Sequence, residues 1–148
     1  MLRNRIALLL GTLAIVPLAS AVTASSASAA TIELRETALG QIITDSNGMT
    51  VFMFTPDSKK VDTCQSIEHC TSVWPPLLAE GTPTVGPGLK ARQLKTLTLA
   101  SGAKQLEYKK HPLYGYAGNV NPGETSYIGA LAFGGYWYGL NAKGQPVQ

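Results

Sequence analysis

The chain has 148 residues, with 12 Lys and Arg against 9 Asp and Glu, so its formal net charge is +3. The basic residues are scattered, and Arg3 and Arg5 fall in a segment that we expect to be removed. This distribution lacks the basic face typical of nucleic-acid-binding proteins, and we expect no nucleic acid among the partners.

Residues 1–29 predict a secretory signal peptide, with a basic start, an apolar run and a small-residue tail that ends in Ala-Ser-Ala. The apolar run, Ile6–Ala19, is shorter than the ~20 residues that a membrane-spanning helix needs. No cysteine lies near the predicted cleavage position, so a lipid anchor is not expected there. We therefore expect a single domain over residues 30–148, secreted and either extracellular or associated with the cell envelope, with no membrane span after cleavage.

The segment Gly40–Asp57 has the pattern of paired strands. Its "SNG" supplies the Asn-Gly that tight hairpin turns favour. In "VFMF", Val51 and Met53 should point to one side and Phe52 and Phe54 to the other, because successive side chains of a strand alternate.

Cys64 and Cys70 are the only cysteines, and an exported chain with such a close pair is expected to form a disulfide. Closing this loop is worth about 2.4 kcal/mol in the chain-entropy account. The one stretch that could be helical is short, from Cys64 to about Val73, and Pro75 and Pro76 end it.

The second half of the chain repeats the layout of the first. Gly102–Asn119 aligns without a gap with Gly40–Asp57 at an offset of 62, and Trp74 and Trp137 follow at an offset of 63. The Gly- and Pro-rich loop Glu80–Gly88 separates the two segments.

These features predict an all-β fold of two hairpin-based repeats, about 39–80 and 102–144. One hairpin unit alone would be marginally stable. We therefore expect the two repeats to pack as one antiparallel sheet assembly with a shared core, with at most one short helix near the cysteine pair.

The pieces "FMFTPD", "CTSVWPPLL", "QLEYKKHPLYGYAGN" and "YWYGLNAKG" together resemble bacterial secreted or lipoprotein repeat proteins that share a Tyr-x-(Phe, Trp or Tyr)-x-x-Asp motif. The resemblance spans about Leu39–Gly144. It implies a fold and a secreted location rather than a reaction, because the function of that family is unassigned. The chain departs from the pattern at Phe52, which replaces the first Tyr, at Asn119, which replaces the second Asp, and in lacking a lipid-carrying Cys.

We expect the motif positions to be mainly architectural; they are Phe52, Phe54, Asp57, Trp74 and Trp137. Asp57 is expected to accept backbone N–H groups and close a turn, which Asn119 could also do. The two Trp side chains are expected to fill the core.

Tyrosines crowd the second repeat and are candidates for stacking on a ligand. If several share an exposed face, they would suit a sugar or a protein partner. The candidates are Tyr114, Tyr116, Tyr136 and Tyr138, and the expected partner is an unknown extracellular protein or glycan.

Neither a catalytic nor a metal-binding pattern is present in the sequence. Nucleophile-elbow, zinc-protease and phosphate-loop motifs are missing, and Asp45, Asp57 and Glu124 are scattered on predicted turns. The possible metal ligands follow no compact spacing; they are Met49, Met53, His69 and His111. We expect no catalytic residue, no metal and no cofactor.

The sequence therefore predicts a non-enzymatic extracellular or cell-envelope module with a binding or structural role. The alternative is a metal-binding or redox accessory protein of the cell envelope, and an enzyme comes third.

Overall fold

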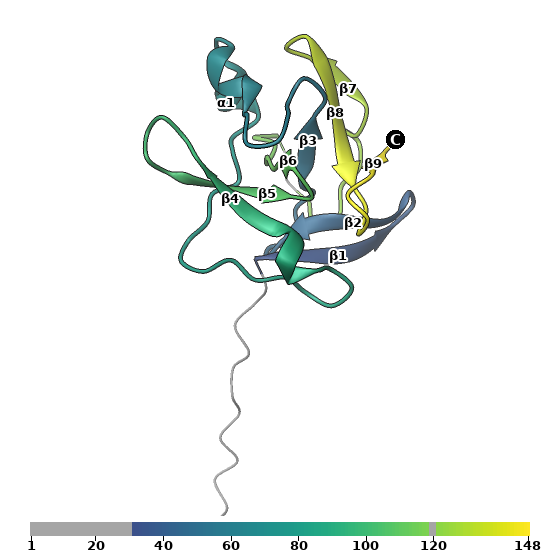
Figure 1. Cartoon of the computed structure of the whole chain (residues 1–148). Coiled ribbons are helices and arrows are strands. Elements are labelled where there is room, and N and C mark those ends of the chain that lie inside the picture. The colour runs from purple at the N-terminus through teal and green to yellow at the C-terminus, as the bar shows by residue number, and fades with distance from the viewer. Residues whose placement is uncertain (1–30, 119–120) are drawn as a thin grey trace, which may run out of the picture.

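The computed structural model describes residues 31–118 and 121–148 (Figure 1). The predicted signal peptide and Asn119 lie outside these residues. The described chain is built from short strands that pair antiparallel, with three brief helical turns, so the prediction of an all-β fold is confirmed.

The strands are β1 Ile32–Thr37, β2 Gly40–Asp45, β3 Phe52–Phe54, β4 Leu94–Thr98, β5 Lys104–Tyr108, β6 His111–Pro112, β7 Ala130–Ala132, β8 Gly135–Leu140 and β9 Pro146–Val147. The helical turns are η1 Thr63–Ser66, α1 Cys70–Val73 and η2 Ala91–Gln93.

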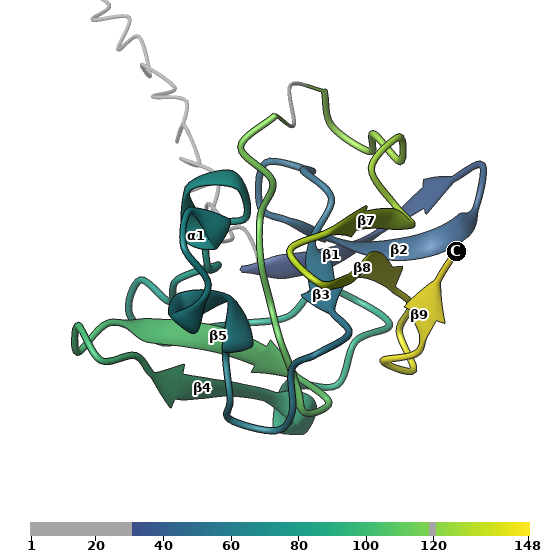
Figure 2. The same ribbon diagram turned by 90° about the horizontal axis from the view of Figure 1, so that it is seen from above.

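The strands form three small sheets. β1 pairs with β2, β8 lies between β3 and β7 with β9 beside it, and β5 lies between β4 and β6. Single bridges join the sheets, among them Thr44 with Thr50 and Phe52 with Tyr114. Figures 1 and 2 show the β4–β5 hairpin and the β7–β8 strands on opposite sides of the central β3.

The turn after β2 contains the Asn-Gly that the sequence indicated. It spans three residues, because Asp45 N–H donates to Met49 O at 2.9 Å, and only Gly48 adopts a positive φ, 78°. The Asp45 carboxylate fastens the turn by accepting the N–H groups of Asn47 at 2.8 Å and Met49 at 2.9 Å. A short carboxylate side chain that binds the backbone ahead of it is a common turn-former.

β3 divides two hydrophobic cores. As the alternation predicts, Val51 and Met53 pack into one core and Phe52 and Phe54 into the other. The first core is mainly aliphatic and also holds Leu106 and Tyr108. The second is aromatic, and it also holds Cys64, Cys70, Trp74, Tyr114 and Trp137.

The predicted disulfide and short helix are both present. Cys64 and Cys70 are bonded, with their Cα atoms 5.4 Å apart, and α1 begins at Cys70. Asp62 caps η1 by accepting the Gln65 N–H at 3.0 Å. The chain leaves the helical geometry at Trp74, immediately before the two prolines.

Contacts in the centre of the molecule come in pairs that are related by the offset of 62 or 63. Phe52 and Tyr114 themselves exchange two backbone hydrogen bonds, each 2.9 Å long. Thr55 N–H donates to Tyr136 O at 3.0 Å, and the equivalent Ala117 N–H donates to Val73 O at 2.8 Å. We infer that the two halves are copies of one unit, related by a pseudo-two-fold axis that passes between Phe52 and Tyr114.

The equivalent hairpins begin earlier than the sequence alignment indicates. β1 starts at Ile32 and β4 at Leu94, again 62 residues apart, ahead of the predicted repeat starts near 39 and 102. The sequences of these first strands, IELRET and LKTLT, share no residue at equivalent positions. Their common role is visible only in the pairing of each with the strand that follows.

Candidate functional site

The aromatic core contains a continuous series of ring contacts. Trp137 and Trp74 stack with their centroids 4.2 Å apart and their planes 3° from parallel. Tyr114 meets Trp137 edge-on at 5.1 Å, and on the other side Tyr116 lies 4.5 Å from Trp74. Tyr127 continues the series, 4.1 Å from Tyr116. We call these five residues the aromatic column.

The motif phenylalanines pack against this column. Phe54 stacks on Trp137 at 4.2 Å, in the place that Tyr116 takes on Trp74. Phe52 meets Trp74 edge-on at 5.0 Å, as Tyr114 meets Trp137. All of the motif aromatics are buried, and their architectural role stays a prediction.

Asp57 binds across the boundary between the two halves. Its Oδ2 accepts the Tyr114 hydroxyl at 2.5 Å, and its Oδ1 accepts the Thr63 N–H at 2.7 Å. Its own N–H donates to Phe54 O at 3.1 Å, which closes the turn after β3. The carboxylate therefore fixes the loop from 57 to 63 and holds the second half of the chain through Tyr114.

The surroundings of Asp57 change its acidity. The pKa of this carboxyl is raised from 3.8 to about 6, chiefly by burial and also by the nearby Asp62, which together outweigh the lowering effect of the hydrogen bonds from Tyr114 and Thr63. The pKa of Tyr114 is also raised, first by burial and then by the hydrogen bond to Asp57. The pair is thus a phenol that keeps its proton, bound to a carboxylate that accepts a proton more readily than an exposed Asp.

The four predicted stacking tyrosines do not form one surface. Tyr114 is fully buried, so its ring cannot reach a ligand from solvent, and it does not belong among the candidates for ligand stacking. Tyr116 is partly exposed and belongs to the aromatic column. Tyr136 and Tyr138 stand apart on β8, with their rings 5.6 Å apart and 8° from parallel.

Tyr136 shares an outward face with Leu131, and Tyr138 lies on the same side of β8 but is partly buried against the aliphatic core. Leu131 on β7 pairs directly with Tyr136 on β8, and residues opposite each other in a pair of strands project from the same face. Leu131 is 69% exposed and Tyr136 is 44% exposed, and these two are the exposed large hydrophobic side chains of the described sheet. We call Leu131, Tyr136 and Tyr138 the β7–β8 face.

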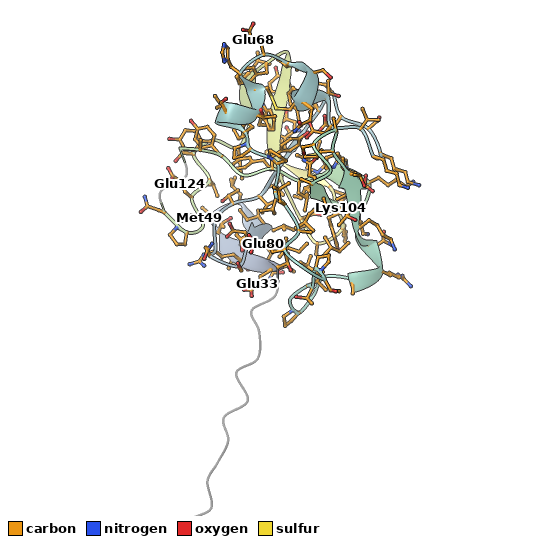
Figure 3. All side chains as sticks on the ribbon, turned by 90° about the vertical axis from the view of Figure 1, so that its left-hand side faces the viewer. Glu33, Met49, Glu68, Glu80, Lys104 and Glu124 are labelled. Atoms are coloured by element: carbon orange, nitrogen blue, oxygen red, sulfur yellow. A yellow bond between two sulfur atoms is a disulfide. The ribbon has the colours of Figure 1, made fainter. Side chains whose placement is uncertain are left out.

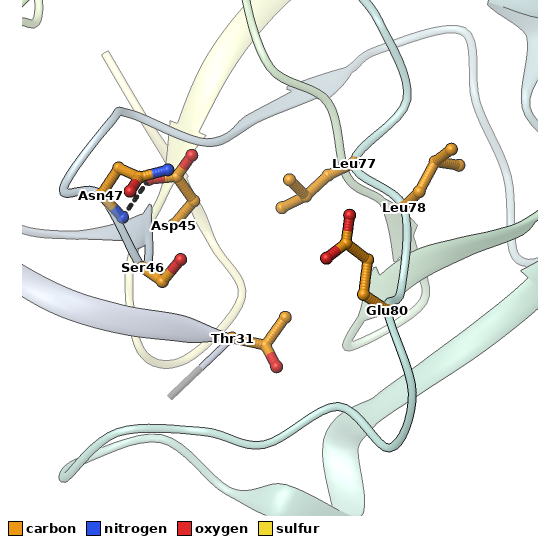
Figure 4. A pocket seen from close by; sticks show the side chains of 7 residues that line it. All are labelled: Thr31, Asp45, Ser46, Asn47, Leu77, Leu78 and Glu80. Carbon is orange, nitrogen blue, oxygen red and sulfur yellow. Dashed lines mark hydrogen bonds between the residues drawn. The ribbon is translucent and has the colours of Figure 1, made fainter. Parts of the chain in front are cut away.

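Pockets on the described surface include two that contain none of the predicted site residues. One, of about 350 Å³, has Leu77, Leu78 and Glu80 on one side and the turn after β2 on the other (Figure 4). Asp45 lines it, but Asp45 Oδ1 is already bound to the turn's own N–H groups. The other, of about 380 Å³, lies between the first hairpin and the C-terminal segment, lined by residues such as Leu39 and Lys143.

The possible metal ligands named from the sequence have different surroundings. Met53 is buried in the aliphatic core, whereas the side chain of His69 is 80% exposed beside Glu68. His111 is half-buried, and burial lowers the pKa of its imidazole. Within residues 31–118 and 121–148, no three His, Cys, Asp or Glu side chains gather as a metal site would require.

Charged side chains are dispersed in the same way. Glu68 and Glu33 lie at opposite ends of the molecule in Figure 3.

Of the helices that the structure describes, none has the length and apolar character to cross a membrane.

Two residues at these sites were missed from the sequence. Asp62 lies beside the Asp57–Tyr114 pair, and its Oδ2 accepts a hydrogen bond from Gln65 Nε2 at 3.1 Å. The three-residue spacing from Asp62 to Gln65 is that of a capping box, so the sequence did carry a signal for this residue. Leu131 carries no such signal, because an isolated Leu between two Ala gives no hint of its exposure.

Residues 33–78 match a protein family described as a secreted repeat of unknown function. This part of the chain is similar to a secreted repeat. The match runs from β1 through Trp74 to the bridge at Leu78, which is one of the two equivalent units. No curated protein and no solved structure gives a significant match. The comparison supports a secreted module of unassigned function, while the Tyr-x-(Phe, Trp or Tyr)-x-x-Asp definition stays a prediction.

Proposed function

We propose that this protein is a secreted, non-enzymatic binding module that contacts an extracellular or cell-envelope protein through its β7–β8 face. The observation that carries the proposal is the exposure of Leu131 and Tyr136 side by side on paired strands. Aromatic side chains are enriched where proteins meet, and a neighbouring aliphatic group adds apolar area to such a contact.

The geometry of the two tyrosines favours a protein partner over a glycan. Their rings are parallel and stacked on each other, so each ring covers part of its neighbour's face. A sugar ring stacks on an open aromatic face, and this arrangement leaves less of that face free. Ring edges, phenol hydroxyls and the Leu131 side chain instead offer a mixed surface of the kind found at protein interfaces.

A non-enzymatic role is supported by the state of two of the three acidic candidates, Asp57 and Asp45. Asp57 is bound by Tyr114 and Thr63, and Asp45 by the turn that it closes. An acid or base in catalysis has to be within hydrogen-bonding reach of a substrate. Both carboxylates are committed to the fold.

The test is co-sedimentation of the purified mature protein with cell-envelope fragments from the producing cells. We expect the parent protein to sediment with untreated fragments and to stay in solution after the fragments have been treated with protease. The variant Leu131→Ser/Tyr136→Ser should lose this retention while its denaturation curve stays close to that of the parent, because both side chains are exposed.

The matched control is Leu39→Ser, which removes an exposed leucine from the turn between β1 and β2. It should sediment like the parent protein. Equal retention of the double variant and the parent would reject the β7–β8 face. Retention that survives protease but not glycosidase treatment would replace the protein partner with a glycan.

A further inference from the structure

The aromatic column connects a buried tyrosine with the surface. From Tyr114, which is fully buried, to Tyr127, which is partly exposed, no centroid distance between successive rings exceeds 5.1 Å. The intermediate rings are Trp137, Trp74 and Tyr116, in that order. Electrons transfer readily between rings in contact, so distance does not interrupt this path.

Every member of the column is a side chain that can lose one electron. Indole and phenol are the most easily oxidised aromatic groups of proteins, and phenylalanine is not oxidised under the same conditions. Phe52 and Phe54 lie beside the column and pack against the two Trp rings. The oxidisable path is therefore bounded by inert rings and opens toward solvent at Tyr127.

Only one buried ring of the column is joined to a base. The Tyr114 hydroxyl donates to Asp57 Oδ2 at 2.5 Å. The indole Nε1 of Trp137 donates to Ala132 O at 3.2 Å, and a carbonyl cannot take the proton. The buried Nε1 of Trp74 has no hydrogen-bond partner within the part of the chain that the structure describes.

An oxidised phenol is a strong acid, so the removal of an electron from Tyr114 drives its proton onto the bound carboxylate. The raised pKa of Asp57, about 6, leaves it mainly ionised at neutral pH and makes it a better acceptor than an ordinary Asp. The oxidised Trp rings have no equivalent acceptor. The radical is therefore most stable at Tyr114.

We propose that the aromatic column is a one-electron relay that carries an oxidising equivalent from the surface to Tyr114. A one-electron oxidant in the extracellular medium, such as an oxyl radical or a high-potential metal complex, takes one electron from Tyr127. Tyr127 and then Tyr116, both partly exposed, release the hydroxyl proton to water when they are oxidised and take one back when the next ring inward reduces them. The electron vacancy passes on through the two Trp rings to Tyr114, and the Tyr114 proton moves from Oη to Asp57 Oδ2. No bond between heavy atoms forms or breaks, and one electron from a reductant, with return of the proton, restores the starting state.

The relay is tested by photo-oxidation of the mature protein with tris(bipyridine)ruthenium(III), generated by a light flash in the presence of a sacrificial electron acceptor. Tyr136→Phe/Tyr138→Phe is the background, because these phenols lie outside the column. Transient absorption and freeze-quenched electron paramagnetic resonance distinguish phenoxyl from indole radicals. We expect a long-lived phenoxyl signal that Tyr114→Phe abolishes and that Asp57→Asn makes shorter-lived.

Two further variants keep the test decisive even if Tyr114→Phe folds poorly. Tyr116→Phe keeps a ring but interrupts the column near the surface, and should lower the phenoxyl yield. Tyr108→Phe removes another fully buried phenol, one whose hydroxyl donates to Ala142 O rather than to a carboxylate, and should leave the signal intact. An unchanged signal in Tyr114→Phe, or an unchanged yield in Tyr116→Phe, would overturn the relay. Either result leaves the test of the β7–β8 face unaffected.

Discussion

Trp74 and Trp137 lie face to face, with ring centroids 4.2 Å apart and planes 3° from parallel. Each comes from the same position of one half of the chain, and each meets an aromatic ring from its own half edge-on. Their stacked rings form a contact between the two halves of the chain. The halves therefore share one core and depend on each other for it.

Replacing either Trp should destabilise the whole molecule. Trp74→Ala and Trp137→Ala should each lower the free energy of unfolding by roughly 3–5 kcal/mol, the range for emptying a large aromatic site in a core. Because the rings touch, the double variant should lose less than the two single losses together. Chemical denaturation measures all three, and losses below about 1 kcal/mol for both single variants would mean that the stack does not hold the halves together.

Asp57 should act as a hydrogen-bond acceptor. Asp57→Ala leaves the Thr63 N–H and the Tyr114 hydroxyl without their acceptor and should cost about 1–3 kcal/mol. Asp57→Asn keeps an amide oxygen and should cost less. The check is a thermodynamic cycle of Asp57→Ala with Tyr114→Phe, in which the coupling should be at least about 0.5 kcal/mol. Additive losses would show that the hydrogen bond contributes nothing.

The charge of Asp57 should make stability depend on pH. Its pKa in the folded protein is about 6, above the ordinary 3.8, so the folded state binds this proton more tightly than the unfolded chain. Its stabilising contribution is therefore complete below pH 3.8 and is lost as the pH rises through about 6. Denaturation of the parent and Asp57→Asn across this window should show a difference in slope, with the parent losing stability relative to the variant as the pH rises. Parallel curves would contradict the raised pKa.

Local patterns in the sequence predicted the all-β class and the two faces of β3. Val51 and Met53 alternate with Phe52 and Phe54 on a backbone whose side chains point to opposite sides in turn, so neighbours in sequence were enough. The disulfide and the short helix were predictable for the same reason, since both lie within one stretch of about ten residues.

The partners of these residues were not predictable, because they come from the other half of the chain. Nothing near Asp57 in the sequence indicates that Tyr114 binds it, or that Tyr114 is buried while Tyr136 is exposed. The offset of 62 aligned Phe52 with Tyr114, but it gave no indication that these two aligned residues are in contact. A two-fold arrangement puts equivalent residues in contact near its axis, and only the structure locates that axis.

The disulfide should stabilise the aromatic core as a local crosslink. Cys64→Ser/Cys70→Ser should lower the free energy of unfolding by on the order of 2 kcal/mol, because the seven-residue loop is no longer closed in the unfolded chain. Both sulfurs are buried beside Trp74, so lost packing would add to this cost. Thiol titration of the native parent protein should find no free thiol. Two reactive thiols in the absence of reductant would show that the Cys64–Cys70 disulfide does not form.

Two of the departures from the predicted motif, Phe52 and Asn119, should be linked. Tyr114 binds Asp57, and the same offset of 62 relates this pair in the sequence to Phe52 and Asn119, which carry neither a hydroxyl nor a carboxylate. Phe52→Tyr alone places a hydroxyl in a fully buried site and should cost about 1–3 kcal/mol. From the sequence offset alone, we predict that adding Asn119→Asp restores a pair like that of Tyr114 and Asp57, so the double variant should recover much of that loss in chemical denaturation. Asn119→Asp alone is the control, and a double variant no more stable than Phe52→Tyr would show that the two-fold relation does not extend to this pair.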